Sequence, residues 1–194
     1  MPSSDPSGRY TTTAALLHWL IAVVVLGMIA FGWLMQEIPK DPVGARANAF
    51  NLHKSIGLSV LMLMLARVAW RATHPPPAFP PMPVWQARTA RAVHLLLYVC
   101  LFVQPLSGYL GSAYSGYPVK FFGMALPAWA PKNVAIKDAM STVHLVNSCV
   151  LVAALILHFA GALKHVLVDR DGSFRRIWPW GDGARDRAVE GASD

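Results

Sequence analysis

Charged residues are scarce in this chain. Asp, Glu, Lys and Arg make up only 14% of its 194 residues, whereas hydrophobic residues make up 55%. This balance argues against a water-soluble domain and indicates one compact unit whose solvent is largely lipid. Nothing in it indicates a nucleic acid partner.

Cysteine is also rare. Cys100 and Cys149 both fall inside predicted helices and form neither a CxxCH haem-attachment motif nor a CxxC redox pair. This excludes covalent haem attachment and dithiol chemistry, and we expect both thiols to be packed apolar groups. Any cofactor must be held by other side chains.

Long apolar runs dominate the remaining sequence. Four of them predict membrane-spanning helices, at about 13–36, 48–72, 90–113 and 138–168. The first run lacks the cleavage site of a signal peptide, so we expect a retained anchor. The sequence therefore predicts an all-α integral membrane four-helix bundle with both termini on one side, in a single domain over residues 8–178.

The segments between the helices are polar and rich in proline, which cannot continue a helix. The third connection contains Tyr117, Phe121, Phe122 and Trp129, and we expect it to lie at the membrane interface as an aromatic cap. The chain after Val168 is charged and contains glycine, so we expect it to be soluble and partly disordered, ending in a polar tail over residues 179–194.

Lysines and arginines in the connections predict the orientation N-in and C-in. The inner side then carries Arg9, Arg71, Arg88, Arg91, Lys164, Arg170, Arg175 and Arg176. The outer side carries Lys40, Arg46, Lys54, Lys120, Lys132 and Lys137, opposed by Glu37, Asp41 and Asp138. The outer surface therefore remains basic.

Histidines occur inside these apolar runs, where ionisable groups usually have a function. His144 and His158 are fourteen residues apart on the last helix, which brings them within about 40° of one face at depths about 21 Å apart. His18 matches the depth of His158, and His53 matches the depth of His144. Two cross-helix pairs are predicted: His18 with His158, and His53 with His144.

A metal ion or a haem is the natural occupant between two such histidines. Two imidazoles leave zinc or copper short of ligands, whereas a haem needs only two axial ligands. A flat macrocycle needs neighbours without bulk, which these glycines provide: Gly27, Gly57, Gly108, Gly111 and Gly161. The alternative is that the histidines are hydrogen-bonded within the bundle without a cofactor.

The segments "LLHWL", "NLHKSIGLSVLMLMLARVAWRATHPPP" and "TVHLVNSCVLVAALILHFAGALKH" resemble the bacterial cytochrome b561 family. The resemblance covers about residues 8–178. It implies a multi-pass cytochrome of the bacterial inner membrane with two b-type haems, bound at His18, His53, His144 and His158. This agrees with the pairing by depth.

Further residues acquire candidate roles from this resemblance. His94 and His165 lie near the inner haem and are candidate donors to a quinone, with ubiquinone as the expected acceptor. Arg67 is expected to pair with an internal partner such as a haem propionate, and Lys54 is the corresponding candidate on the outer side.

Three functions follow as hypotheses. The resemblance implies a membrane oxidase that takes electrons from superoxide at the outer face and reduces ubiquinone. The alternative is an electron-carrier subunit that docks a partner oxidoreductase such as a hydrogenase or formate dehydrogenase. The third is a haem-free scaffold, which the matched histidines disfavour. No catalytic residue is identified.

Overall fold

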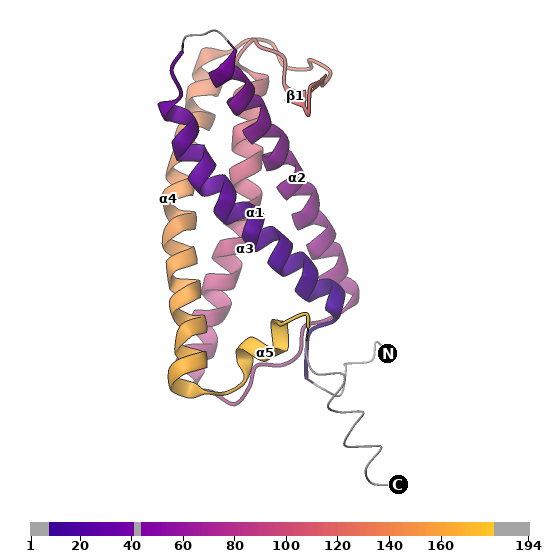
Figure 1. Cartoon of the computed structure of the whole chain (residues 1–194), viewed down its shortest axis with the longest axis vertical. Coiled ribbons are helices and arrows are strands. Elements are labelled where there is room, and N and C mark those ends of the chain that lie inside the picture. The colour runs from indigo at the N-terminus through magenta and orange to yellow at the C-terminus, as the bar shows by residue number, and fades with distance from the viewer. Residues whose placement is uncertain (1–7, 41–43, 181–194) are drawn as a thin grey trace.

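The computed structural model describes residues 8–40 and 44–180. In this part of the chain, four helices are long and apolar enough to cross a membrane. They are α1 (Thr12–Glu37), α2 (Ala45–Thr73), α3 (Val84–Ala113) and α4 (Val134–Lys164). They form one elongated bundle (Figure 1), which confirms the predicted all-α four-helix membrane fold.

Helix packing is uneven around the bundle. Close backbone packing joins α3 with α4, α1 with α2, and α2 with α3, whereas contacts between α1 and α4 are sparse. Large apolar side chains are exposed along all four helices, including Leu20, Leu65, Leu95 and Leu157. This surface fits lipid as the solvent.

The helices extend beyond the apolar runs that predict them. Helix α3 begins at Val84, immediately after Pro83, and α4 begins at Val134, where the Asn133 side chain accepts a hydrogen bond from the Ile136 N–H at 3.1 Å. Apolar runs report the hydrocarbon-crossing part of a helix, and polar turns continue it on either side. One π-helical turn, η1 (His165–Asp169), extends α4.

The buried core is one cluster from all four helices. Its members are Ile21, Val25, Val60, Met64, Leu97, Cys100, Leu151 and Ala154. Leu151 lies midway along α4 between His144 and His158, so this cluster stands between the two histidine depths. Cys100 is buried as expected, but Cys149 is exposed, because its position on α4 faces outward.

A short hairpin lies at one end of the bundle, which we call the hairpin end. It consists of β1 (Lys120–Phe121) and β2 (Met124–Ala125), paired antiparallel. Phe122 and Gly123 form its turn with positive φ angles of 46° and 92°, as in a type I′ turn. The buried Ser55 of α2 fixes the turn, since its Oγ accepts from the Phe122 N–H at 2.9 Å.

The opposite end, which we call the terminal end, is closed by residues 170–180, here named the C-terminal strap. The strap contains α5 (Ser173–Ile177), which lies between the ends of α4 and α1 (Figure 1). The Trp19 Nε1–H donates to the Ile177 carbonyl at 3.0 Å, and the Trp19 ring contacts Phe174 and Trp178.

The sequence predicts a partly disordered segment after Val168, and within that segment the strap has defined structure. Its Phe174 and Trp178 rings contact Trp19 of α1, and Arg176 donates to the Gly8 and Ala78 carbonyls at 2.6 and 2.7 Å. These contacts outweigh the polar composition on which the expectation rested. Of the predicted polar tail, residues 181–194 lie outside the described residues, as does Asp41.

Candidate functional site

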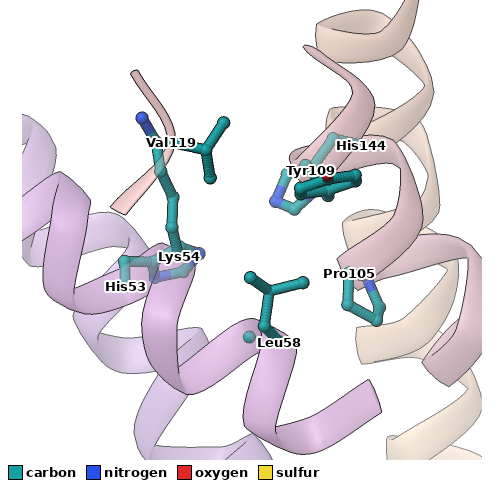
Figure 2. A pocket seen from close by; sticks show the side chains of 9 residues that line it. His53, Lys54, Leu58, Pro105, Tyr109, Val119 and His144 are labelled. Atoms are coloured by element: carbon teal, nitrogen blue, oxygen red, sulfur yellow. The ribbon is translucent and has the colours of Figure 1, made fainter. Parts of the chain in front are cut away.

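The histidines predicted to pair at the hairpin end face each other across the bundle. The ring centroids of His53 on α2 and His144 on α4 are 6.3 Å apart, with ring planes at 72°. They lie on either side of a narrow, partly open slot (Figure 2). The slot is lined by Lys54, Gly57, Leu58, Pro105, Gly108, Tyr109 and Val119. It is therefore mainly apolar, with one lysine at its edge.

The second predicted pair faces across the terminal end in the same way. The ring centroids of His18 on α1 and His158 on α4 are 6.2 Å apart, with ring planes at 71°. His94 of α3 joins this pair, because its ring centroid lies 5.3 Å from that of His158. The structure therefore brings three predicted site residues together at this end.

Two glycines give the hairpin-end rings their space. A Cβ atom at Gly108 would lie 3.1 Å from His144 Cε1, and one at Gly32 would lie 3.3 Å from His53 Cε1. Both distances are shorter than ordinary carbon contacts, so a side chain would press on the ring. Gly108 thus makes room for the His144 ring. Gly32 makes room for the His53 ring, and the sequence analysis did not identify it although its depth on α1 matches that of His53.

The other glycines considered from the sequence have different surroundings. A Cβ at Gly111 would meet the α4 side chain of Met140 at 3.4 Å, so this glycine allows close helix packing. Positions Gly27 and Gly161 face open space within 4 Å. Gly57 lines the hairpin-end slot.

Arg67 has protein partners within the bundle. Its Nε donates to the Tyr98 hydroxyl and its Nη1 to the Ala14 carbonyl, both at 3.1 Å. Ala14 is one helical turn before His18, so the guanidinium lies beside the terminal-end histidines. It borders a small, partly open pocket that is also lined by Tyr10, Leu17, Trp70, Arg71, His74 and Pro76.

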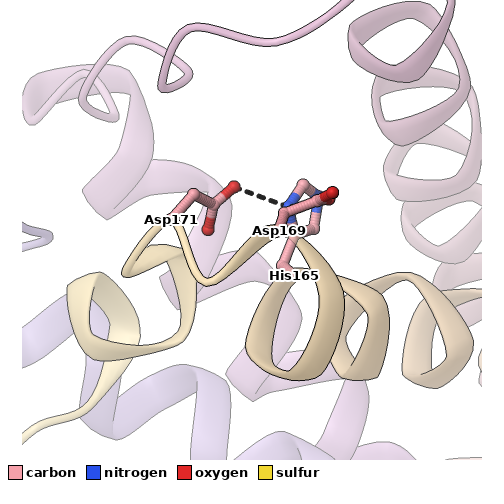
Figure 3. Close-up of side chains that lie close together, drawn as sticks. All are labelled: His165, Asp169 and Asp171. Atoms are coloured by element: carbon pink, nitrogen blue, oxygen red, sulfur yellow. Dashed lines mark hydrogen bonds and ion pairs between the residues drawn. The ribbon is translucent and has the colours of Figure 1, made fainter.

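His165 lies beyond this group, at the bend into the strap. Its Nδ1 is 2.7 Å from Asp171 Oδ2 and 3.3 Å from Asp169 Oδ2 (Figure 3). Asp171 also accepts from the Ser173 N–H at 2.9 Å. Burial alone would raise the pKa of Asp171, but hydrogen bonds from Ser173 and His165 outweigh it and lower that pKa below the ordinary value.

Several polar groups beside these histidines were not predicted from the sequence. They are Ser55, Tyr98, Gln104, Ser107, Asn147 and Asp171. Depth along a helix is readable from residue number, but the partner of a ring nitrogen depends on helix rotation. Asn147, one turn after His144 in an apolar helix, was the most visible signal.

The fold and the two histidine layers define a class of protein, the helical membrane bundle with paired buried imidazoles. Comparison with protein families gives a match to prokaryotic cytochrome b561 over residues 9–180. The chain belongs to this family. It is therefore a multi-pass bacterial membrane protein that carries electrons with b-type haem.

Individual relatives agree with this assignment. The chain is 37% identical to cytochrome b561 homolog 2 of Escherichia coli (strain K12) over 182 residues, covering 91% of this chain and 95% of the relative. It is 26% identical to cytochrome b561 homolog 1 of the same organism over 178 residues, covering 88% and 97%. A probable superoxide oxidase of Yersinia pestis is 24% identical over 173 residues, covering 88% and 96%.

Proposed function

We propose that the protein is a two-haem cytochrome of the inner membrane that passes electrons from superoxide at the hairpin end to ubiquinone at the terminal end. His53 and His144 hold one haem, and His18 and His158 hold the other. When bound, haem b supplies one-electron chemistry that no side chain here provides. In balance, two superoxide ions, one quinone and two protons give two dioxygen molecules and one quinol.

The separation of the paired rings is the observation that carries this proposal. Two imidazoles on opposite sides of one metal ion place their centroids about 6 Å apart, given metal–nitrogen bonds of about 2 Å and a ring radius of about 1 Å. The observed 6.3 and 6.2 Å fit this arrangement. Histidines hydrogen-bonded to each other would stand closer together.

Charged side chains near each pair suit the carboxylates of haem. At the edge of the hairpin-end slot stands Lys54, whose ammonium has no hydrogen bond or ion pair within the described residues. At the terminal end, Arg67 uses two donors on Tyr98 and Ala14 and keeps others for a propionate. We assign both side chains this role.

The quinone end of the proposal rests on His94 and His165. His94 lies against His158, and His165 lies at the end of α4 with its Nδ1 held by Asp171. Because Nδ1 faces the Asp171 carboxylate, Nε2 of His165 is the ring nitrogen left for a quinone oxygen, and it donates there in the imidazolium form, in which both ring nitrogens carry a proton. We expect His165→Ala to slow quinol formation while both haems remain reducible by superoxide, and unchanged turnover would remove His165 from this role.

The proposal that superoxide is the electron donor can be tested through the negative charge of superoxide. The hairpin end carries Lys40, Lys120 and Lys132, which should attract a small anion. We expect the second-order rate of haem reduction by superoxide, in stopped flow, to fall as salt shortens the Debye length from about 30 Å to about 8 Å. Replacing these three lysines by glutamine should lower the rate and flatten its salt dependence.

Lys137 provides a matched control, because its Nζ already pairs with Asp138 at 2.9 Å. Lys137→Gln should therefore change the rate less than the triple variant. A slow reaction that is insensitive to salt in the unaltered protein would reject superoxide as donor. Purification together with a catalytic subunit would then favour the electron-carrier alternative.

A further inference from the structure

The two hairpin-end histidines differ in what their second ring nitrogen meets. His144 Nδ1 lies 2.9 Å from the Gln104 carbonyl oxygen and 3.3 Å from Ser107 Oγ. His53 Nδ1 is buried and has no hydrogen-bond partner within the described residues. The two proposed haem ligands look equivalent in sequence, but the hydrogen bonding of their second ring nitrogen differs.

A cross-helix network surrounds the Gln104 carbonyl that His144 uses: Asn147 holds the Gln104 side chain, and Ser107 contacts the carbonyl itself. Asn147, one turn after His144 on α4, donates from Nδ2 to Gln104 Oε1 at 2.6 Å and to the Cys100 carbonyl at 3.0 Å. The Ser107 hydroxyl, 3% exposed, donates to the Gln104 carbonyl at 3.0 Å. Asn147 thereby ties α4 to α3 at the depth of the imidazole.

On the other side of the slot, His53 packs against Gly32, which has no side chain that could accept a hydrogen bond. A Cβ atom built on Gly32 would lie 3.3 Å from His53 Cε1 and 3.9 Å from its Nδ1. The nitrogen therefore points toward a backbone without a side chain. A hydroxyl at this position is the shortest group that can reach it.

We propose that Asn147 and Gln104 are positioning residues that make His144 the stronger axial donor and so lower the reduction potential of the hairpin-end haem, while Gly32 leaves His53 unassisted. An acceptor on the second N–H raises the basicity of a ligating imidazole. A more basic ligand stabilises the oxidised iron, and hydrogen bonding around the ligands is one of the means by which proteins set haem potentials. The proposal rests on the ligand assignment made above.

The variant Asn147→Leu tests the part of the proposal that concerns His144. The two haems are titrated with a reductant, and optical and electron paramagnetic resonance spectra monitor the reduction of each. The hairpin-end haem should become easier to reduce by about tenfold in its equilibrium constant, which is about 59 mV for one electron. The terminal-end haem should keep its potential. Ser148→Ala is the matched control, because the Ser148 Oγ donates within its own helix to the Leu145 carbonyl.

Gly32→Ser and Gly32→Ala test the His53 side as a pair. Both substitutions add the same Cβ, so any steric effect on the ring is common to them. The serine hydroxyl alone offers His53 Nδ1 an acceptor, and the hairpin-end potential should be lower in the serine variant than in the alanine variant. This comparison separates hydrogen bonding from packing.

Unchanged hairpin-end potential in Asn147→Leu protein with both haems bound would overturn the proposal, as would equal shifts of both haems. If that variant loses its haem, the Gly32 pair decides, and equal potentials in serine and alanine variants overturn it. An unaltered protein without a hairpin-end haem would instead refute the proposed function, so the two failures are distinguishable.

Discussion

Four histidines on three helices define two layers in this protein, His18 with His158 and His53 with His144. Each layer draws one ring from α4 and one from a different helix. In the proposed function each ring serves one iron, so the two layers are chemically independent although they share a helix.

Substitution of the α4 histidines tests this independence. We expect His158→Ala to loosen or remove the terminal-end haem and leave the other intact, because only one iron loses a ligand. His144→Ala should do the converse. The measurement is the haem content and low-spin absorbance of each purified variant.

Two intact six-coordinate haems in either variant would show that the pairing is wrong. Loss of both haems from one variant can reflect misfolding. His74→Ala therefore serves as a control, since His74 stacks on Trp70 at the end of α2 and belongs to neither pair.

Sequence reasoning located the histidines and missed the groups that orient them. Depth follows from residue number at about 1.5 Å per residue, so four positions suffice to predict both pairs. The partners of the ring nitrogens depend on how α3 and α4 are rotated about their axes. For that reason the Gln104 carbonyl and the bare backbone of Gly32 appear only in the structure.

Among the structural elements, the hairpin of β1 and β2 stands next to the proposed haem ligand His53. Ser55, 2% exposed and two residues after His53, holds it by accepting from the Phe122 N–H at 2.9 Å, while its hydroxyl lies 2.8 Å from the Asn51 carbonyl and 3.3 Å from the Lys120 carbonyl. The left-handed backbone of Phe122 is unfavourable for a bulky residue. An external partner is therefore needed to keep the turn in place.

Ser55→Ala should detach the hairpin without unfolding the bundle. It leaves the Phe122 N–H without its partner, which costs about 1–3 kcal/mol. Amide hydrogen exchange over residues 119–125 should become faster, while exchange in α3 stays unchanged. Ser59→Ala is the control, since the Ser59 hydroxyl donates to the Ser55 carbonyl of its own helix, and equal exchange in both variants would contradict the role of Ser55.

The C-terminal strap is the element that the sequence misrepresented most. Its charge and glycine suggested disorder, but Phe174 and Trp178 pack against Trp19, directly after His18. Asp171 links the strap to α4 through His165. Composition alone could not reveal this because the aromatic partners are far apart in the chain.

The strap should respond to acid in a defined direction. The pKa of Asp171 is lowered in the folded protein, because hydrogen bonds from Ser173 and His165 outweigh the opposing effect of burial. Its contribution to strap closure is therefore present above the unfolded pKa of about 4 and is lost as pH falls through the lower folded pKa.

A spin label at the exposed Arg175 reports this change. Its mobility should stay low at about pH 6 and rise as pH falls through the lowered folded pKa of Asp171. Asp171→Asn protein should show high mobility throughout this range. A label equally immobile in both proteins at every pH would contradict the linkage.

For the whole molecule, the four-helix bundle was predictable because lipid-crossing helices appear in sequence as long apolar runs. The uneven packing was not, since it depends on which faces meet. Helices α1 and α4 make few backbone contacts, and His18 and His158 face each other across the space between these two helices. The core around Leu151 and Met64 then separates the two histidine layers.

The central claim is that this bundle holds two haems, each between two histidines. Haem stoichiometry and absorption spectra of the purified protein test it most directly. We expect two haem b molecules per chain, both six-coordinate and low-spin in the oxidised and reduced states. One haem per chain, or a high-spin five-coordinate spectrum, would contradict the two-pair arrangement.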